Sequence, residues 1–187
     1  MKTVATGIAV ALIGLSTAGA WQAAPNPAAP KEGPEGLTDP QIAGIVVAAN
    51  QVDIDAGKLA ETKAQNKDVQ AFAQQMVTDH TAVNKSATEL VQKLHVTPAP
   101  SKTSEKLTQG GEENVAKLKT LQGKAFDAAY MNHEVYYHKA VIEELDKRLI
   151  PGAQNAELKA LLVKVRPAFQ AHLEHAQQVQ KEVEKSG

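Results

Sequence analysis

The chain has 187 residues, and its 20 basic and 21 acidic side chains nearly cancel. This balance argues against a nucleic-acid-binding protein, because such proteins carry a surplus of lysine and arginine that neutralises phosphates. The sequence contains no cysteine, which excludes a disulfide framework and a lipid anchor attached through a thioether. A length of this order suits one domain with short appendages.

The first 20 residues have the pattern of a secretory signal peptide. Lys2 precedes an apolar run from Val4 to Leu15, and the small residues Ala18, Gly19 and Ala20 follow it. We expect cleavage after Ala20 and a periplasmic or secreted mature protein. The alternative is a retained membrane anchor, although the apolar run is shorter than the about 20 residues that span a bilayer.

The segment from 21 to 38 is rich in proline and alanine and has no apolar periodicity. Such a composition is typical of a disordered or extended tether. The ordered domain is expected over residues 39–185. Pro40 favours a helix start there. The N–H groups of the first turn have no acceptor within the helix, so a proline, which has no N–H group, costs no hydrogen bond at this position.

Four long segments repeat apolar residues every three or four positions, as amphipathic helices do. We expect these helices over residues 40–64, 67–94, 124–149 and 154–184. No segment alternates apolar and polar residues over the length of a strand. The sequence therefore predicts an all-α fold, an antiparallel four-helix bundle.

A weaker helical pattern lies between the second and third of these helices. Its apolar positions are Leu107, Val115 and Leu118, and Gly110 with Gly111 lowers its helical propensity. We expect a short extra helix before the third long one.

Each long helix carries an ionisable residue within its apolar face. These residues are Asp53 on the first helix, His80 on the second, Glu134 and His138 on the third, and His172 on the fourth. Imidazole and carboxylate groups from facing helices can bind Cu, Zn, Fe, Mn or Ni ions. The five residues are therefore a candidate site for a transition metal.

The number of residues between each site residue and the turn that joins its helix to the neighbouring helix gives the position of that residue along the bundle axis, which we call its height. With a rise of 1.5 Å per residue, Asp53 and His80 lie within about 5 Å of the same height. His138 and His172 are predicted to differ by about 9 Å, and Glu134 matches His172 better. The alternative to a metal site is a buried hydrogen-bond network that only fixes how the helices pack.

Four stretches carry a family resemblance: DIDAGKLA, VQAFAQQMVTDHTAV, GKAFDAAYMNHEVYYH and AHLEHA. They resemble the bacterial domain of unknown function family 4142, over about residues 39–183. The resemblance implies a ferritin-like helical bundle and an exported protein. The family's motif histidines correspond to His80, His138 and His172, and its motif acids to Asp79 and Asp127.

The chain departs from the ligand pattern of ferritin-like di-iron enzymes. Those proteins use Glu-x-x-His on two helices, whereas Glu134 and His138 are four residues apart on one helix only. Asp53 stands where many family members carry a glutamate. Nucleophile-elbow, phosphate-loop and HExxH motifs are also missing, so the sequence favours a protein without catalytic activity and indicates no particular protein partner.

Overall fold

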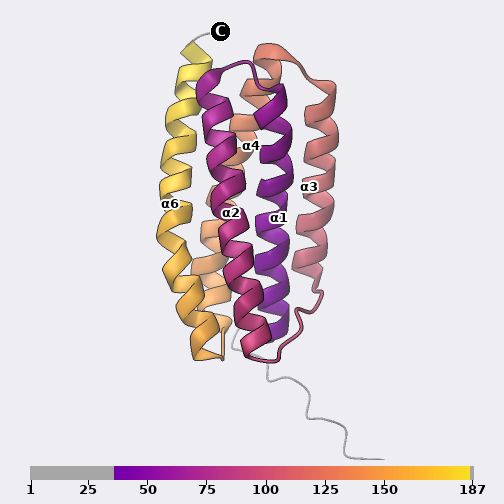
Figure 1. The fold of residues 1–187 in the computed structure, drawn as a ribbon, viewed down its shortest axis with the longest axis vertical. Coiled ribbons are helices and arrows are strands. Elements are labelled where there is room, and N and C mark those ends of the chain that lie inside the picture. Colours follow the sequence, from indigo (N-terminus) through magenta and orange to yellow (C-terminus); the bar gives the residue numbers. More distant parts are fainter. Residues whose placement is uncertain (1–35, 186–187) are drawn as a thin grey trace, which may run out of the picture.

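A computed structural model describes residues 36–185, and within this range the chain is helical with no strand. Figure 1 shows five long helices that lie alongside one another: α1 (Asp39–Lys63), α2 (Lys67–Lys93), α3 (Lys102–Thr120), α4 (Gly123–Glu144) and α6 (Ala156–Lys185). The all-helical prediction is confirmed. The predicted signal peptide and most of the predicted tether lie outside the described residues. Between residues 36 and 185, no helix combines the length and apolar composition that crossing a bilayer requires.

Side-chain caps define where the first two helices begin. The hydroxyl of Thr38 accepts a hydrogen bond from the Gln41 N–H, and Gln41 in turn accepts from the Thr38 N–H. Asn66 accepts hydrogen bonds from the first free N–H groups of α2. Leu37, at the end of the predicted tether, is buried against the domain.

Carboxylates from other helices hold two of the turns. Asp127 on α4 accepts the N–H groups of Gln65 and Asn66 between α1 and α2, at 3.1 and 2.9 Å. Asp39 in the first turn of α1 accepts the N–H groups of Gln154 and Asn155, both at 2.9 Å, just before α6. These bonds satisfy backbone donors that a turn would otherwise leave to water.

The helical path of the chain continues past residue 149, where the third predicted helix ends. A π-helix, η1 (Leu145–Leu149), follows α4 directly, and a single turn, α5 (Ile150–Gly152), follows η1. Pro151 fits because it lies in the first turn of α5. The turn to α6 is therefore centred near residue 154, about two residues later than expected.

Helix α3 is longer than the predicted short helix. It continues through Gly110 and Gly111 and ends at Thr120. Gly111 lets α3 approach α1 closely, since a Cβ atom at this position would lie 2.7 Å from a methyl carbon of Val52. In Figure 1, α3 stands at the edge of the molecule next to α1.

The remaining four long helices enclose a dense core. Its largest fully buried side chains include Phe72, Phe126, Tyr130, Met76 and Leu162. Complete burial of an apolar side chain of this size contributes about 1.5–3 kcal/mol to folding. Ionisable groups within such a core are costly unless they are paired, so those that lie there need an explanation.

Candidate metal centre

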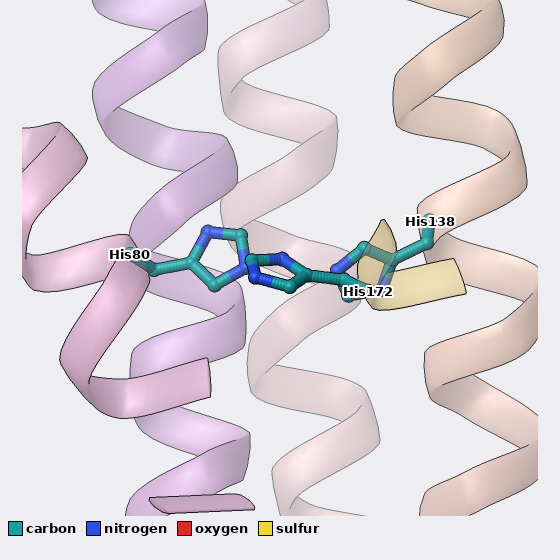
Figure 2. Close-up of side chains that lie close together, drawn as sticks. All are labelled: His80, His138 and His172. Atoms are coloured by element: carbon teal, nitrogen blue, oxygen red, sulfur yellow. The ribbon is translucent and has the colours of Figure 1, made fainter. Parts of the chain in front are cut away.

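The structure brings all five predicted site residues together inside the bundle. Asp53, His80, Glu134, His138 and His172 are each at most 3% exposed. Figure 2 shows the imidazoles of His80, His138 and His172 converging from α2, α4 and α6. One ring nitrogen of each of these histidines lies within 4.8 Å of one from each of the others. Atoms of Asp53, Glu134 and His138 also lie within 4.8 Å of one another.

The predicted separation of His138 and His172 was wrong. Their ring centroids are 5.5 Å apart, whereas the estimate gave about 9 Å in height alone. One reason is that the turn between the two helices is centred near residue 154, later than expected. His138 and His172 are therefore separated from this turn by more nearly equal numbers of residues. The other is that helical side chains lean toward the N-terminus of their own helix. In antiparallel helices this moves His138 away from the turn and His172 toward it, which narrows the gap.

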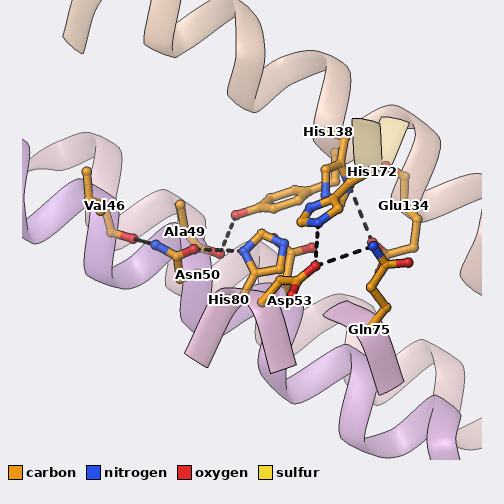
Figure 3. A network of polar contacts seen from close by, with 11 residues as sticks. Val46, Ala49, Asn50, Asp53, Gln75, His80, Glu134, His138 and His172 are labelled. Atoms are coloured by element: carbon orange, nitrogen blue, oxygen red, sulfur yellow. Dashed lines mark hydrogen bonds and ion pairs between the residues drawn. The ribbon is translucent and has the colours of Figure 1, made fainter. Parts of the chain in front are cut away.

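The hydrogen bonds of His80 determine which of its nitrogens is free. Its Nδ1 lies 2.7 Å from Oδ1 of Asn50, and the amide nitrogen of Asn50 donates to the carbonyl of Val46, also at 2.7 Å. Figure 3 shows this chain of contacts. Because the amide oxygen can only accept, Nδ1 of His80 must carry the proton. The lone pair is then on Nε2, which is buried without a hydrogen-bond partner.

The other two histidines follow the same arrangement. Nδ1 of His138 donates to the backbone carbonyl of Glu134 at 3.0 Å, and Nε2 of His172 donates to Oδ2 of Asp79 at 2.9 Å. Nε2 of His138 and Nδ1 of His172 are buried without a partner. Each ring thus has one nitrogen fixed from outside and one available as a ligand, as in metal-binding histidines.

Two carboxyl groups complete the site. Oδ2 of Asp53 lies 3.5 Å from Nε2 of His80, and Oε2 of Glu134 lies 3.5 Å from Nδ1 of His138. All four carboxyl oxygens and the hydroxyl of Tyr130 are buried, and none of them has a partner within strict hydrogen-bond geometry. Glu134 nevertheless lies close enough to Asp53 and to Tyr130 for a weak side-chain interaction with each. Polar atoms of this kind are rarely left unpaired in a protein core.

Burial shifts the ionisation of these groups toward their neutral forms. It lowers the pKa of His138 to about 4 and also lowers the pKa values of His80 and His172. It raises the pKa of Glu134 to about 8, and burial together with the nearby Glu134 carboxylate raises the pKa of Asp53. At neutral pH the imidazoles therefore keep free lone pairs, whereas Glu134 retains a proton that a cation would displace.

Periodicity alone did not identify two residues that orient the histidines. Asn50 is an uncharged amide on an apolar helix face, and such residues often only bond to their own helix. Asp79 entered through the family resemblance, but its side chain is 43% exposed and lies off the apolar face. The other motif acid, Asp127, holds a turn and is not part of the site.

Three other histidines stay outside the cluster. Nδ1 of His175 lies 3.0 Å from the side-chain oxygen of Gln75, and His133 stacks on Tyr137 with ring centroids 5.4 Å apart. His95 follows α2 in a left-handed backbone conformation, with φ of 53°. The site therefore contains the three histidines that the family motif includes.

Comparisons with known proteins agree with the resemblance in the sequence. A family model described as Domain of unknown function (DUF4142) matches residues 22–179. Searches of curated proteins and of solved structures each returned no significant match. Because the family model covers most of the chain, the chain belongs to the DUF4142 family of domains of unknown function.

Proposed function

We propose that this protein binds a transition-metal ion in its bundle core through His80, His138 and His172, with Asp53 and Glu134 as additional ligands. Two observations carry the proposal: the three imidazoles converge, and each has one nitrogen in a hydrogen bond and the other buried without one. Metal–nitrogen bonds of about 2.0–2.1 Å hold ligand atoms about 3.4 Å apart in a tetrahedral site. Small side-chain rotations would bring nitrogens from within 4.8 Å to that spacing.

The mixed donor set suits several first-row ions. Imidazole binds Zn, Cu, Fe and Ni, and carboxylates extend the range to Mn. Because an ion of this group must displace a proton from Glu134, binding should strengthen as the pH rises toward 8. The role we infer is storage, buffering or sensing of such an ion.

A purely structural network explains the site less well. Such a network would pair its members, because each unpaired buried polar group costs about 1–3 kcal/mol. Here His80, His138 and His172 each keep one nitrogen without a hydrogen bond, and the carboxyl groups of Asp53 and Glu134 have only long contacts with the imidazoles, at 3.5 Å. A bound cation would satisfy these atoms together.

The proposal includes where the protein works and which bundle it forms. Helices α1, α2, α4 and α6 each contribute a ligand, which supports a ferritin-like bundle with α3 added outside it. The signal-like segment 1–20 supports export to the periplasm or beyond. N-terminal sequencing of protein recovered from the periplasm and medium tests this, with Trp21 as the expected first residue. A chain that still begins at Met1 in the cytoplasm would contradict it.

Elemental analysis of the exported protein tests the metal site directly. We expect a stoichiometric first-row metal in the wild-type protein and its loss in His80→Ala. The matched control is His175→Ala, which removes a partly buried histidine outside the cluster. A wild-type protein that stays metal-free after incubation with Cu, Zn, Fe, Mn and Ni ions in turn would overturn the proposal.

A further inference from the structure

A second feature of the fold is a groove of about 520 Å³ between α1, α3 and α4. It exists because α3 packs closely on α1 at Gly111 but stands away from α4. Most of its walls are apolar or aromatic, formed among others by Ala49, Val52, Leu107, Tyr136, Tyr137 and Val141. Its size falls within the range of small-molecule sites.

One part of the groove is polar. His133 and Asn114 both line it, and Nε2 of His133 and the amide nitrogen of Asn114 are buried without hydrogen-bond partners, so a small side-chain movement would turn them toward a ligand. The ring of His133 is held in place by stacking on Tyr137, at an angle of 19° between the ring planes. The amide nitrogen of Asn114 is a hydrogen-bond donor, and Nε2 of His133 is one when it carries the ring proton, so together they suit a ligand group that only accepts.

The charges around the groove favour an anion. Lys106 lines it and forms no ion pair within the described part of the chain, and the positive charge of Lys117 acts on His133. The acidic residue of the lining, Glu144, is already paired with Arg148 at 2.6 Å. The groove therefore combines apolar walls with hydrogen-bond donors and an unpaired cation.

We propose that this groove binds an amphipathic anion, a molecule with an apolar chain or ring and a carboxylate. The apolar body would lie against Tyr136, Leu107 and Val141, and the carboxylate would accept from His133 and Asn114. Tyr136, which is 73% exposed, stands at the groove as an aromatic surface that such a ligand would cover. The proposal does not depend on a metal, because none of the five metal-site residues lines the groove.

Calorimetric titration with decanoate, below its micelle concentration, tests the charge preference. We expect decanoate to bind at one site and decanol to bind at least about tenfold more weakly, since it lacks the charge-assisted hydrogen bonds. Decyltrimethylammonium, with the opposite charge, should not bind measurably. No binding of decanoate, or equal binding of the three probes, would overturn the proposal.

Gly110 allows the position of the ligand to be tested. It lines the groove, and a Cβ atom there would have no heavy atom within 4 Å, so Gly110→Trp should fill the groove without disturbing the core. We expect this variant to lose decanoate binding while its circular dichroism and thermal melting stay close to wild type. Gln109→Trp, next to it on the exposed side of α3, should bind normally.

Two further variants separate the groove from the metal centre. His133→Ala should weaken decanoate binding about tenfold, and His80→Ala should leave it unchanged. Binding that survives in Gly110→Trp, or that disappears in His80→Ala with the fold intact, would place the ligand elsewhere and refute the proposal.

Discussion

His80 and Asn50 are joined by a 2.7 Å hydrogen bond inside the core, and the direction of that bond is set by a third group. The amide of Asn50 donates to the carbonyl of Val46, which leaves only its oxygen to face the imidazole. The proton on His80 is thereby kept on Nδ1, and the lone pair faces the cluster. A residue that would not itself touch an ion thus determines whether His80 can bind one.

Replacing Asn50 by leucine should therefore weaken metal binding without removing a ligand. We expect the affinity to fall by about 10–100-fold, as for other groups that orient ligands. The metal-free protein should lose about 1–3 kcal/mol in free energy of unfolding, because Nδ1 of His80 loses its acceptor. Calorimetric titration and urea denaturation measure the two effects. Asn132→Ala, which breaks an exposed bond to Gln180, is the control.

Asp79→Ala should affect metal binding more than stability. This carboxylate fixes the tautomer of His172, yet its side chain is 43% exposed, so its removal uncovers little apolar surface. We expect a loss of affinity of about 10–100-fold and a change in free energy of unfolding of less than about 1 kcal/mol. An unchanged affinity in calorimetric titration would mean that Asp79 does not orient a ligand.

Asp127→Ala should have the opposite effect. Asp127 accepts two backbone N–H groups from the turn before α2 and does not reach the cluster. We expect the free energy of unfolding to fall by about 1–3 kcal/mol, with metal affinity of the folded protein close to wild type. The two acids of the family motif would then have separate roles. A large loss of affinity in a folded Asp127→Ala protein would contradict this division.

The stabilising contribution of Glu134 to the metal-free protein should fall as the pH rises from about 6.5 to 8. Glu134 has a pKa of about 8 in the folded chain against an ordinary value of 4.5. Over this range the folded state holds a proton that the unfolded state has released, so rising pH favours unfolding. Asp53 acts in the same direction. His80, His133, His138 and His172 act oppositely, because their pKa values are lowered from 6.5. At pH 6.5 about half of each of these side chains is still protonated in the unfolded state, so the Glu134 effect must be measured against a variant that keeps the same histidines.

We expect the free energy of unfolding of the wild type to decrease by about 2 kcal/mol across this interval relative to that of Glu134→Gln, because glutamine is neutral in both states. Urea denaturation of the two proteins in the presence of a chelator, at several pH values, measures the difference, and the histidine contributions cancel because both proteins contain them. A difference that stays constant between pH 6.5 and 8 would show that Glu134 is already ionised in the folded chain.

Substitution by alanine should have opposite effects on stability at the adjacent residues Gly110 and Gly111 of α3. Gly111→Ala places a Cβ atom 2.7 Å from Val52 and should destabilise the protein by about 1–3 kcal/mol. Gly110→Ala meets open space and should stabilise it by about 0.5–1 kcal/mol, because alanine has the higher helical propensity. Thermal melting of the two variants side by side measures the difference, and equal shifts would contradict the close contact of α3 with α1.

The sequence identified the residues of the site because azimuth around a helix follows from residue spacing alone. Asp53, His80 and His172 are each found inside an apolar face, and each is buried in the structure. The positions of the site residues along the bundle axis could not be predicted as well from the sequence. It depends on where a turn falls, and the π-helix from Leu145 to Leu149 with the helical turn through Pro151 moved that point.

Other features depend on contacts between segments that are distant in sequence. The bond from His172 on α6 to Asp79 on α2 joins residues 93 positions apart, and no local pattern indicates it. The length of α3 was underestimated because Gly110 and Gly111 lower helical propensity. The packing of Gly111 against Val52 on α1 offsets that cost, which propensity alone does not include.

The turns held by Asp39 and Asp127 have a consequence for local opening. Backbone amides in turns usually exchange their hydrogens quickly, because water reaches them without unfolding of the helices. The amides of Gln65, Asn66, Gln154 and Asn155 are instead bound to carboxylates from other helices. Their release requires one helix to separate from another, so both ends of the bundle should open together with its centre and not fray independently.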